Sequence, residues 1–477
     1  MMKKTITTKD HESANRRSTF HPKGLPIPTP HPTSLTPYSA SFWALILAAC
    51  GGTGSGGGPK TTGKLVPAAI RSSFEGQNIT VRDLQNIKDG DDPRFDLDGA
   101  SGANYTDAQG TNFIIVTGKF DHSVSVFEFD QSSRQLTFSD SLADDDISPI
   151  ALQRAVRTYD LLIGDTHHIY VTSYFEDAIT RLTLAANGQL QFDNQEASVI
   201  RDSQNSQYAL ESIWTMTHAV FDTAQYFITS GNDDRGLSVF RIGDDGNLTF
   251  VGTHHGSVTT DDGSNLTLNG SVHGQMVKKG DSTFYVGAMQ ESNAMIVYEM
   301  TADGSMSFVH AVNDSSALGL DNPLPGTAVH INGRDFILTP SVEEDAVTIF
   351  ELSSTGRLSH IQTVFDHENT AFELDGATDV SAVQTDKGVL FAVAGKLDDG
   401  VSIFHLDANG RARFITSIED NPSRALDNVR ETEWIKLDDG GLALLVVASD
   451  DDGISLFEID FDDPAGQPAD IPALDVI

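Results

Sequence analysis

An internal repeat constrains the fold more than any other feature of this 477-residue chain. Its core is an alternating strand that ends near an aromatic residue, seen first as Val-Ser-Val-Phe-Glu-Phe at 124–129. The aromatic residue or its equivalent falls at seven positions, which are 127, 182, 240, 298, 350, 404 and 457. A nearly constant period of this length is typical of architectures in which each unit buries its apolar faces against the next unit.

Each copy also carries the same order of segments. An apolar run without alternation, such as 113–116 or 389–393, predicts a strand buried on both faces. An acidic turn and the alternating strand follow, and a Gly-x-Leu-x-Phe segment such as 246–250 or 188–192 predicts a short outer strand. With an innermost strand before the apolar run, each copy has four antiparallel strands. We therefore predict an all-β fold, a seven-bladed β-propeller of four-stranded antiparallel blades, since stacked sandwiches would need units of about seven strands.

The last copy lacks the outer-strand pattern, because Ile459 is followed by Asp460-Phe461-Asp462-Asp463-Pro464. Half of that pattern stands at 63–67, before the first copy. We expect this N-terminal strand to complete the last blade and so remove the free edges of the ring, with 71–97 as a connection into the first blade. The predicted organisation is a leader at 1–62, the propeller at 63–463 and a tail at 464–477.

The charge balance limits the partners. The chain has 31 Lys and Arg against 68 Asp and Glu, a net charge of −37, and the acidic surplus lies after residue 63. Such a body repels a phosphate backbone, so we expect no nucleic-acid partner. Cations and cationic ligands suit it better.

The single cysteine, Cys50, excludes an internal disulfide framework and a cysteine-based zinc site. It ends the apolar segment 41–50 with Leu-Ala-Ala-Cys and precedes the Gly-rich stretch 51–58. This resembles a bacterial lipoprotein signal, in which the cysteine is lipidated, followed by a flexible tether. A partly apolar N-terminal tail is the alternative. The expected location is therefore outside the cytoplasm of a bacterium, periplasmic or anchored to the outer membrane through the lipid alone.

The copies resemble the propeller lactonase superfamily and its relatives with YVTN repeats. The resemblance rests on Ile-Tyr-Val-Thr-Ser-Tyr at 169–174, followed by 177–180, and on the repeated strand patterns over 112–460. The Pro-Asp-Gly turn that is usual in this family is replaced here at 107–110, 332–334 and 386–388. The resemblance implies the propeller fold and, as one alternative, hydrolysis of a sugar lactone.

Acidic residues occupy the turn between the second and third strands of every copy. These turns open on the same face as the entrances to the innermost strands, so together they surround a funnel. A ring of carboxylates focuses a negative potential and can hold hard cations such as Ca²⁺ through oxygen ligands. Repeated turn chemistry in duplicated blades is the alternative interpretation. The candidate metal ligands are Asp233, Asp234, Asp398, Asp399, Asp451 and Asp452.

Deeper in the funnel, polar residues differ from blade to blade at the start of the innermost strands. Aligning the Leu-Asp-Gly motif at 374–376 with its counterparts gives four candidate catalytic residues at comparable positions: Arg157, His273, Asp379 and Glu431. A cation for a carbonyl oxygen and a base for water are what lactone hydrolysis requires. Polar caps around a water-filled channel are the alternative. Candidate ligand-binding residues nearby are Arg154, Glu211, Trp214, His218 and Trp434.

These observations lead to one functional hypothesis and two alternatives. The hypothesis is an exported propeller that binds a small molecule or a protein at its acidic funnel face, as a monomer. The alternatives are a lactone hydrolase and a propeller stabilised structurally by calcium.

Overall fold

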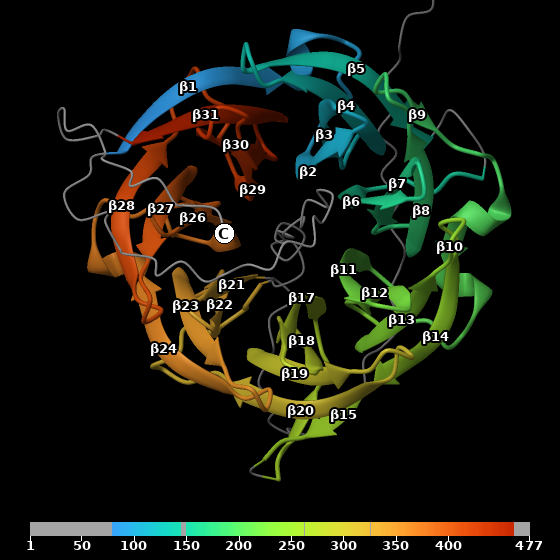
Figure 1. Cartoon of the computed structure of the whole chain (residues 1–477), viewed down its shortest axis with the longest axis vertical. Helices are drawn as coiled ribbons and strands as arrows, with labels where there is room; N and C mark the ends of the chain where they lie inside the picture. The colour runs from blue at the N-terminus through green and yellow to red at the C-terminus, as the bar shows by residue number, and fades with distance from the viewer. Residues whose placement is uncertain (1–78, 145–148, 262, 325, 462–477) are drawn as a thin grey trace, which may run out of the picture. The chain divides into compact units, whose positions relative to one another are not determined.

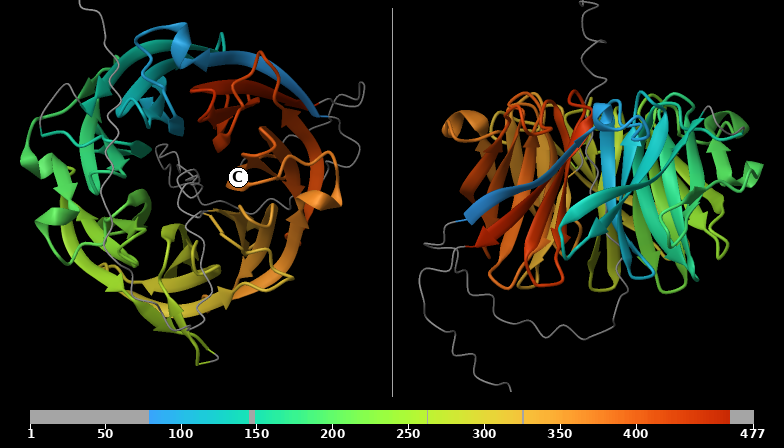
Figure 2. Two further views of the ribbon diagram at one scale, coloured as in Figure 1. Left: turned by 180° about the vertical axis from the view of Figure 1, so that it is seen from behind. Right: turned by 90° about the horizontal axis from the view of Figure 1, so that it is seen from above.

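The computed structural model describes residues 79–144, 149–261, 263–324 and 326–461. These residues form seven antiparallel sheets arranged around a ring, with the chain passing through the sheets in order (Figure 1). The strands run between the two faces of the ring (Figure 2). The predicted seven-bladed β-propeller is therefore confirmed.

Within each blade the strands follow the chain from the centre outward. Blade 1 contains β2 (Ala100–Ala108), β3 (Thr111–Gly118), β4 (Ser123–Asp130) and β5 (Gln135–Ala143). Blade 3 contains β11 (Ile213–Phe221), β12 (Ala224–Gly231), β13 (Gly236–Ile242) and β14 (Leu248–His255). Blade 4 contains β17 (Ser271–Lys279), β18 (Ser282–Met289), β19 (Ala294–Met300) and β20 (Met306–Asn313). Blade 5 contains β21 (Thr327–Ile331), β22 (Arg334–Ser341), β23 (Ala346–Leu352) and β24 (Leu358–Phe365). Blade 6 contains β25 (Ala377–Gln384), β26 (Val389–Gly395), β27 (Gly400–Leu406) and β28 (Ala412–Glu419).

Two regions depart from the regular pattern. The outer edge of blade 2 is split, because beyond β6 (Ala155–Ile163), β7 (Thr166–Ser173) and β8 (Ala178–Leu184) it consists of the short strands β9 (Leu190–Gln191) and β10 (Val199–Arg201). A hairpin of β15 (Ser257–Thr259) and β16 (Asn265–Thr267) leads from blade 3 to blade 4. Neither was predicted. Short 3-10 turns stand at Asp89–Asp91, Glu196–Ser198, Asp202–Gln204 and Asp366–Glu368.

Blade 7 closes the ring with an N-terminal strand, as predicted, but a different segment supplies it. The blade contains β29 (Val429–Lys436), β30 (Leu442–Ala448) and β31 (Gly453–Phe461), and β1 (Ile79–Lys88) pairs with β31 as its outer strand (Figure 1). The prediction that 71–97 is a connection was wrong. Ile79 and Val81 alternate with polar residues and pack on the core of blade 7, which is why this segment forms a strand. Residues 63–67 lie outside the described part of the chain.

The repeated aromatic anchors lie on the third strand of each blade and pack between neighbouring blades. Phe127 of blade 1, for example, is buried with Leu445 and Val447 of blade 7. Phe240, Phe350, Phe404 and Phe457 are also fully buried or nearly so. Each buried aromatic ring contributes about 2 to 3 kcal/mol of transfer free energy, so the repeated anchors stabilise the contacts between blades together with the aliphatic residues around them.

Candidate functional site

Six of the seven innermost strands share an irregularity, and β21 of blade 5 is the exception. Just after each of these six strands begins, its register with the second strand shifts by one residue, as between Ala155 and Arg157 of β6. The first paired residues after this shift include Gly102 of β2, Arg157, Asp379 of β25 and Glu431 of β29. The alignment that placed Arg157, Asp379 and Glu431 at comparable positions therefore agrees with the strand register. His273 belongs to β17, but its side chain lies outside the described part of the structure.

Arg157 and Glu431 meet although blade 1 stands between their blades. The Nη1 atom of Arg157 lies 3.0 Å from Oε2 of Glu431, and each side chain is only 2% exposed. The same Nη1 atom also donates to the carbonyl oxygen of Ser101. This crossing is open because blade 1 has Gly102 at the equivalent position, where a Cβ would lie 2.6 Å from Nη1 of Arg157.

The two carboxylates also bond to the neighbouring blade. Oε2 of Glu431 accepts the N–H of Ala103 at 2.9 Å, from blade 1. Oδ2 of Asp379 accepts the N–H and the hydroxyl of Thr432 at 2.9 and 3.0 Å, from blade 7. Each carboxylate thus accepts a backbone N–H from the inner strand of the next blade.

Elsewhere in the ring, neutral hydroxyl groups accept the equivalent N–H of the next inner strand. The hydroxyl of Tyr159 accepts the N–H of Met216 at 2.8 Å, and Oγ1 of Thr217 accepts the N–H of Gly274 at 3.1 Å. Joining neighbouring inner strands therefore does not require an ionisable side chain. The ionisable side chains of Arg157, Asp379 and Glu431 go beyond that structural need.

Burial shifts the titration of this group. Burial raises the pKa of Asp379 to about 6, against the hydrogen bonds from Thr432 and the charge of Arg157. Burial raises the pKa of Glu431 to about 8, partly offset by Arg157, while the negative charge of Asp379 pushes it further up. The pKa of Glu433, two residues along β29, is also raised well above its usual range by burial. Near neutral pH one carboxyl of this group is therefore ionised while another holds its proton.

Several polar atoms of the innermost strands are buried without a hydrogen-bond partner. They include Nε and Nη2 of Arg157 and Oδ1 of Asp379. Similar atoms nearby along these strands are Oδ1 of Asn104 and the hydroxyls of Thr158 and Thr215. Because a buried unpaired polar group costs about 1 to 3 kcal/mol, a concentration of them marks a place where a polar molecule is expected.

The other candidate ligand-binding residues lie in different surroundings. Trp214 is buried against Tyr174, with ring centres 5.1 Å apart, and Trp434 donates from Nε1 to the carbonyl oxygen of Ser381 at 3.3 Å. His218 bonds to Gln225 at 2.9 Å, near the end of β11 away from the funnel entrance. The structure thus brings Arg157, Asp379 and Glu431 together, whereas these three residues serve packing or local bonds. The last two candidates, Glu211 and Arg154, lie at the entrance to the inner strands.

The acidic turns form repeated hydrogen-bonded junctions, which we call blade clasps. In blade 6 the N–H groups of Leu374, Asp375 and Gly376 are accepted by Asp366, Asp398 and Asp345, at 3.3, 2.9 and 2.8 Å respectively. Asp345 and Asp366 belong to blade 5, so the clasp joins two blades. Blade 1 repeats the arrangement with Leu97, Asp98 and Gly99 bonded to Asp89, Asp121 and Asp452, each at 2.8 Å.

The candidate metal ligands belong to these clasps. Asp234 accepts the N–H of Glu211 at 2.8 Å, Asp399 that of Asn428 at 2.8 Å, and Asp451 that of Leu426 at 3.0 Å. Asp233 accepts the hydroxyl of Ser212 at 2.5 Å. Among the described residues no His, Cys, Asp and Glu side chains form a group of three or more able to hold a metal ion. The clasps give the recurrent acidic residues a structural role, and calcium binding stays a prediction.

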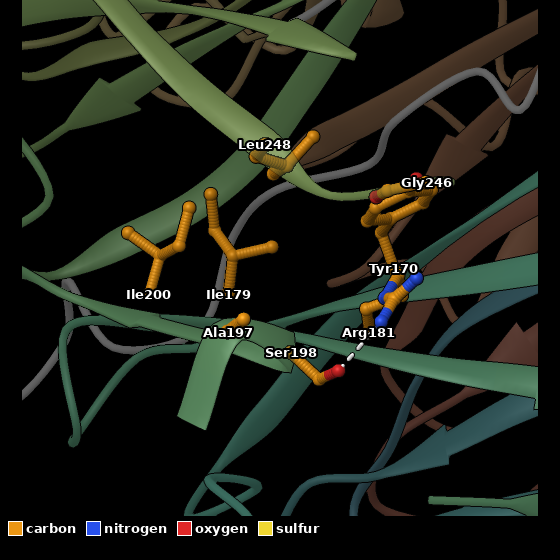
Figure 3. A pocket seen from close by; sticks show the side chains of 8 residues that line it. All are labelled: Tyr170, Ile179, Arg181, Ala197, Ser198, Ile200, Gly246 and Leu248. Carbon is orange, nitrogen blue, oxygen red and sulfur yellow. Dashed lines mark hydrogen bonds between the residues drawn. The ribbon is translucent and has the colours of Figure 1, made fainter. Parts of the chain in front are cut away.

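A small cavity lies between blades 2 and 3, away from the funnel (Figure 3). It is lined by Tyr170, Arg181 and Ser198 among others, and Arg181 donates to the hydroxyl of Ser198 at 2.7 Å. Its volume of about 10 Å³ is room for about one water molecule. It is too small for an organic ligand.

Sequence reasoning missed three buried ionisable residues of the funnel, which are Lys119, Arg430 and Glu433. Lys119 follows an apolar strand directly, and Arg430 and Glu433 flank a residue that was singled out. Their position beside inner-strand segments was the signal that could have identified them.

Comparisons with known proteins support the fold and say nothing about the function of this chain. No family model matches the chain, and no curated protein matches it in sequence. Among solved structures it is similar to Saccharomyces cerevisiae Sqt1, with a TM-score of 0.50 and 11% identity over 80% of this chain and 100% of that one. It is also similar to the Pseudomonas aeruginosa periplasmic gluconolactonase PpgL, with a TM-score of 0.48 and 15% identity over 68% of this chain and 86% of that one. Within the ranges that the structure describes, no helix has the length and hydropathy of a membrane span.

Proposed function

We propose that this propeller binds a small polyhydroxylated molecule at the centre of its funnel, between Arg157, Asp379 and Glu431. The observation that carries the proposal is the set of buried, unpartnered atoms in this group, two N–H donors on Arg157 and one acceptor on Asp379. A bound molecule that offers both an acceptor and a hydroxyl donor would satisfy all three.

The chemistry of these side chains narrows the ligand class. The planar guanidinium of Arg157 presents Nε and Nη2 as parallel donors, which suit a carboxylate or a carbonyl oxygen. Oδ1 of Asp379 accepts a hydroxyl proton. Sugar acids and sugar lactones carry both kinds of group.

A purely structural role does not explain the charges. Tyr159 and Thr217 show that neutral hydroxyls join the inner strands of other blades. Ionised groups at this depth cost several kcal/mol of desolvation, so their concentration near one point supports a binding role.

Lactone hydrolysis is the second candidate, and the different pKa values of the two carboxyls favour it. In this reaction Asp379, as a carboxylate, takes a proton from a water molecule whose oxygen forms a bond to the lactone carbonyl carbon. Arg157 stabilises the negative charge on the carbonyl oxygen. The bond from the carbonyl carbon to the ring oxygen then breaks, and that oxygen takes the proton of Glu431, which gives an open hydroxy acid.

Calorimetric titration with gluconate, together with a lactone hydrolysis assay, tests both candidates. We expect saturable binding that is weakened at least tenfold by Arg157→Lys and by Asp379→Asn. Asp160→Asn is the matched control, because Asp160 is also largely buried on an inner strand and bonds there to His167. Binding that survives Arg157→Lys and Asp379→Asn would contradict the proposal, and binding without hydrolysis would remove the second candidate.

We also propose that the protein is exported and held at a membrane by a lipid on Cys50. The support is the Leu-Ala-Ala-Cys sequence and the glycine-rich stretch after it. Cys50 lies outside the described residues.

A further inference from the structure

Apolar side chains stand at the funnel entrance on three blades, and we call them the apolar rim. Its members, Phe120, Phe175 and Leu397, are 53%, 58% and 61% exposed, the three highest values among the large apolar side chains of the described residues. Each is the second residue after the second strand of its blade, following β3, β7 and β26 respectively. Because exposed apolar residues are normally scattered singly over a protein surface, their recurrence at one repeated position needs a reason.

The backbone of the blade does not supply that reason. The N–H of Phe120 donates to the carbonyl oxygen of Asp98 at 2.9 Å, and in blade 7 the N–H of Asp450 donates in the same way to Asp427 at 3.1 Å. The residues at this position in the other four blades are all acidic: Asp233, Glu291, Glu343 and Asp450. The turn therefore accepts a polar side chain, and blades 1, 2 and 6 depart from that pattern.

Two of the rim side chains lie directly over the starts of inner strands. A Cβ added to Gly99, just before β2, would lie 2.5 Å from the ring of Phe120. A Cβ added to Gly376, just before β25, would lie 2.9 Å from Cγ of Leu397. These side chains thus cover the inner end of their blades at the funnel entrance.

Phe175 has the same position in blade 2. Its ring centre lies 4.8 Å from the guanidinium carbon of Arg154, which stands just before β6. Arg154 precedes Arg157 by three residues, as Gly376 precedes Asp379. Three residues of extended chain cover about 10 Å at most, so the rim lies within the length of a small molecule from the Arg157 group.

The apolar rim and the Arg157 group also share one side of the ring. Arg157, Asp379 and Glu431 belong to blades 2, 6 and 7, and the rim belongs to blades 1, 2 and 6. Blades 6, 7, 1 and 2 are consecutive around the closed ring (Figure 1). The buried polar atoms and the exposed apolar surface are therefore placed to contact two ends of one molecule.

We propose that the molecule bound at the Arg157 group carries an aryl or alkyl substituent, which packs against Phe120, Phe175 and Leu397. The inference rests on the function proposed above and narrows its ligand class to sugar acids or lactones with an apolar group. The polar end meets Arg157 and Asp379, and the apolar end reaches the entrance. Covering the rim removes its apolar surface from water, which favours binding in proportion to the area covered.

Two glucuronides separate the apolar contribution from the polar one. Methyl and phenyl glucuronide share a carboxylate and the sugar hydroxyls, and they differ only in the group on the opposite side of the sugar ring. In calorimetric titrations we expect the native protein to bind phenyl glucuronide at least tenfold more tightly than methyl glucuronide. This preference should fall to within threefold in the double variant Phe120→Ser, Phe175→Ser, whose affinity for methyl glucuronide should stay within threefold of native.

Leu162→Ser is the matched control, because Leu162 is 51% exposed but lies near the end of β6 away from the funnel entrance. Its preference should equal that of the native protein. The replaced rim side chains are more than half exposed, so these substitutions should leave the fold intact.

The outcomes distinguish this inference from the proposed function. If methyl glucuronide binds but phenyl glucuronide binds no more tightly, or if the preference survives in the double variant, the inference is wrong and the proposed function stands. If gluconate and both glucuronides fail to bind, the proposed function is wrong and the inference fails with it. Sedimentation with phosphatidylcholine vesicles that the double variant loses, without a preference between the glucuronides, would assign the rim to a membrane surface and overturn the proposal.

Discussion

Replacing Gly102 by alanine should disturb the contact between Arg157 and Glu431 and the packing of β2 against β6. A Cβ at Gly102 would lie 2.6 Å from Nη1 of Arg157 and 2.6 Å from the carbonyl oxygen of Val156. The second contact is with the backbone of β6, so a change of side-chain rotamer cannot relieve it. Either β2 moves away from blade 2, or Arg157 leaves its contact with Glu431 and β6 also shifts.

The size of the effect follows from these two routes. Overpacking in a closed core costs about 1 to 3 kcal/mol. Losing the buried 3.0 Å contact between Arg157 and Glu431 leaves a buried polar group unpaired, which costs about 1 to 3 kcal/mol and more when that group is charged, as Arg157 is. We therefore expect Gly102→Ala to lower the free energy of unfolding by about 2 to 5 kcal/mol.

Urea denaturation followed by tryptophan fluorescence measures this change, since Trp214 and Trp434 lie on inner strands. Gly252→Ala is the matched control, because Gly252 lies on β14 and a Cβ there would meet nothing within 4 Å. Arg157→Ala should destabilise the Gly102→Ala variant less than it destabilises the native protein, because in the variant it also removes one of the two clashes. If Gly102→Ala proves as stable as Gly252→Ala, the described path of Arg157 across blade 1 is wrong.

Three further predictions concern titration, the clasps and the anchor. Because folding raises the pKa of Asp379 to about 6 and that of Glu431 to about 8, the folded state keeps protons that the unfolded chain releases. The free energy of unfolding should accordingly fall as the pH rises from about 4.5 to 7, and denaturation of Glu431→Gln across that range should show a smaller slope, whereas an equal slope would contradict the assignment. Asp399→Ala should lower the free energy of unfolding by about 1 to 2 kcal/mol, because it leaves the N–H of Asn428 without its acceptor. Melting curves of the native protein in calcium and magnesium chloride at equal ionic strength should coincide. A melting temperature raised by calcium alone would instead support a metal-binding role for the turns. Cys50→Ser should release the protein from membranes and abolish acyl labelling, and unchanged membrane association would rule the anchor out.

The blades could be predicted because side-chain alternation and turn chemistry repeat with the period of the structure. The anchor at Phe127 recurs in every blade since each blade packs against its neighbour in the same way. The closing strand was misplaced because it was sought by its turn pattern, whereas Ile79 and Val81 join the ring through alternation alone. The outer edge of blade 2 is split because the chain leaves the strand after β9 and returns to the sheet as β10, and the repeat pattern contains no sign of this interruption.

The positions of the funnel residues were predictable, but their contacts were not. The Leu-Asp-Gly loops align because the clasps hold them, with an N–H donor and its acidic acceptor separated by 23 residues in blades 1, 2, 3, 5 and 6. That constant separation was present in the sequence and indicates a structural bond as much as a cation site. The meeting of Arg157 with Glu431 depends on a missing side chain at Gly102, on a blade between them. No repeat pattern encodes such an absence.

A crystal structure of the protein grown with gluconate tests the central claim most directly. We expect density for the bound molecule between blades 1, 2, 6 and 7, with its carboxylate within hydrogen-bond distance of Nη2 of Arg157 and a hydroxyl near Oδ1 of Asp379. Ordered water alone at those atoms, with gluconate absent or bound elsewhere on the propeller, would contradict it.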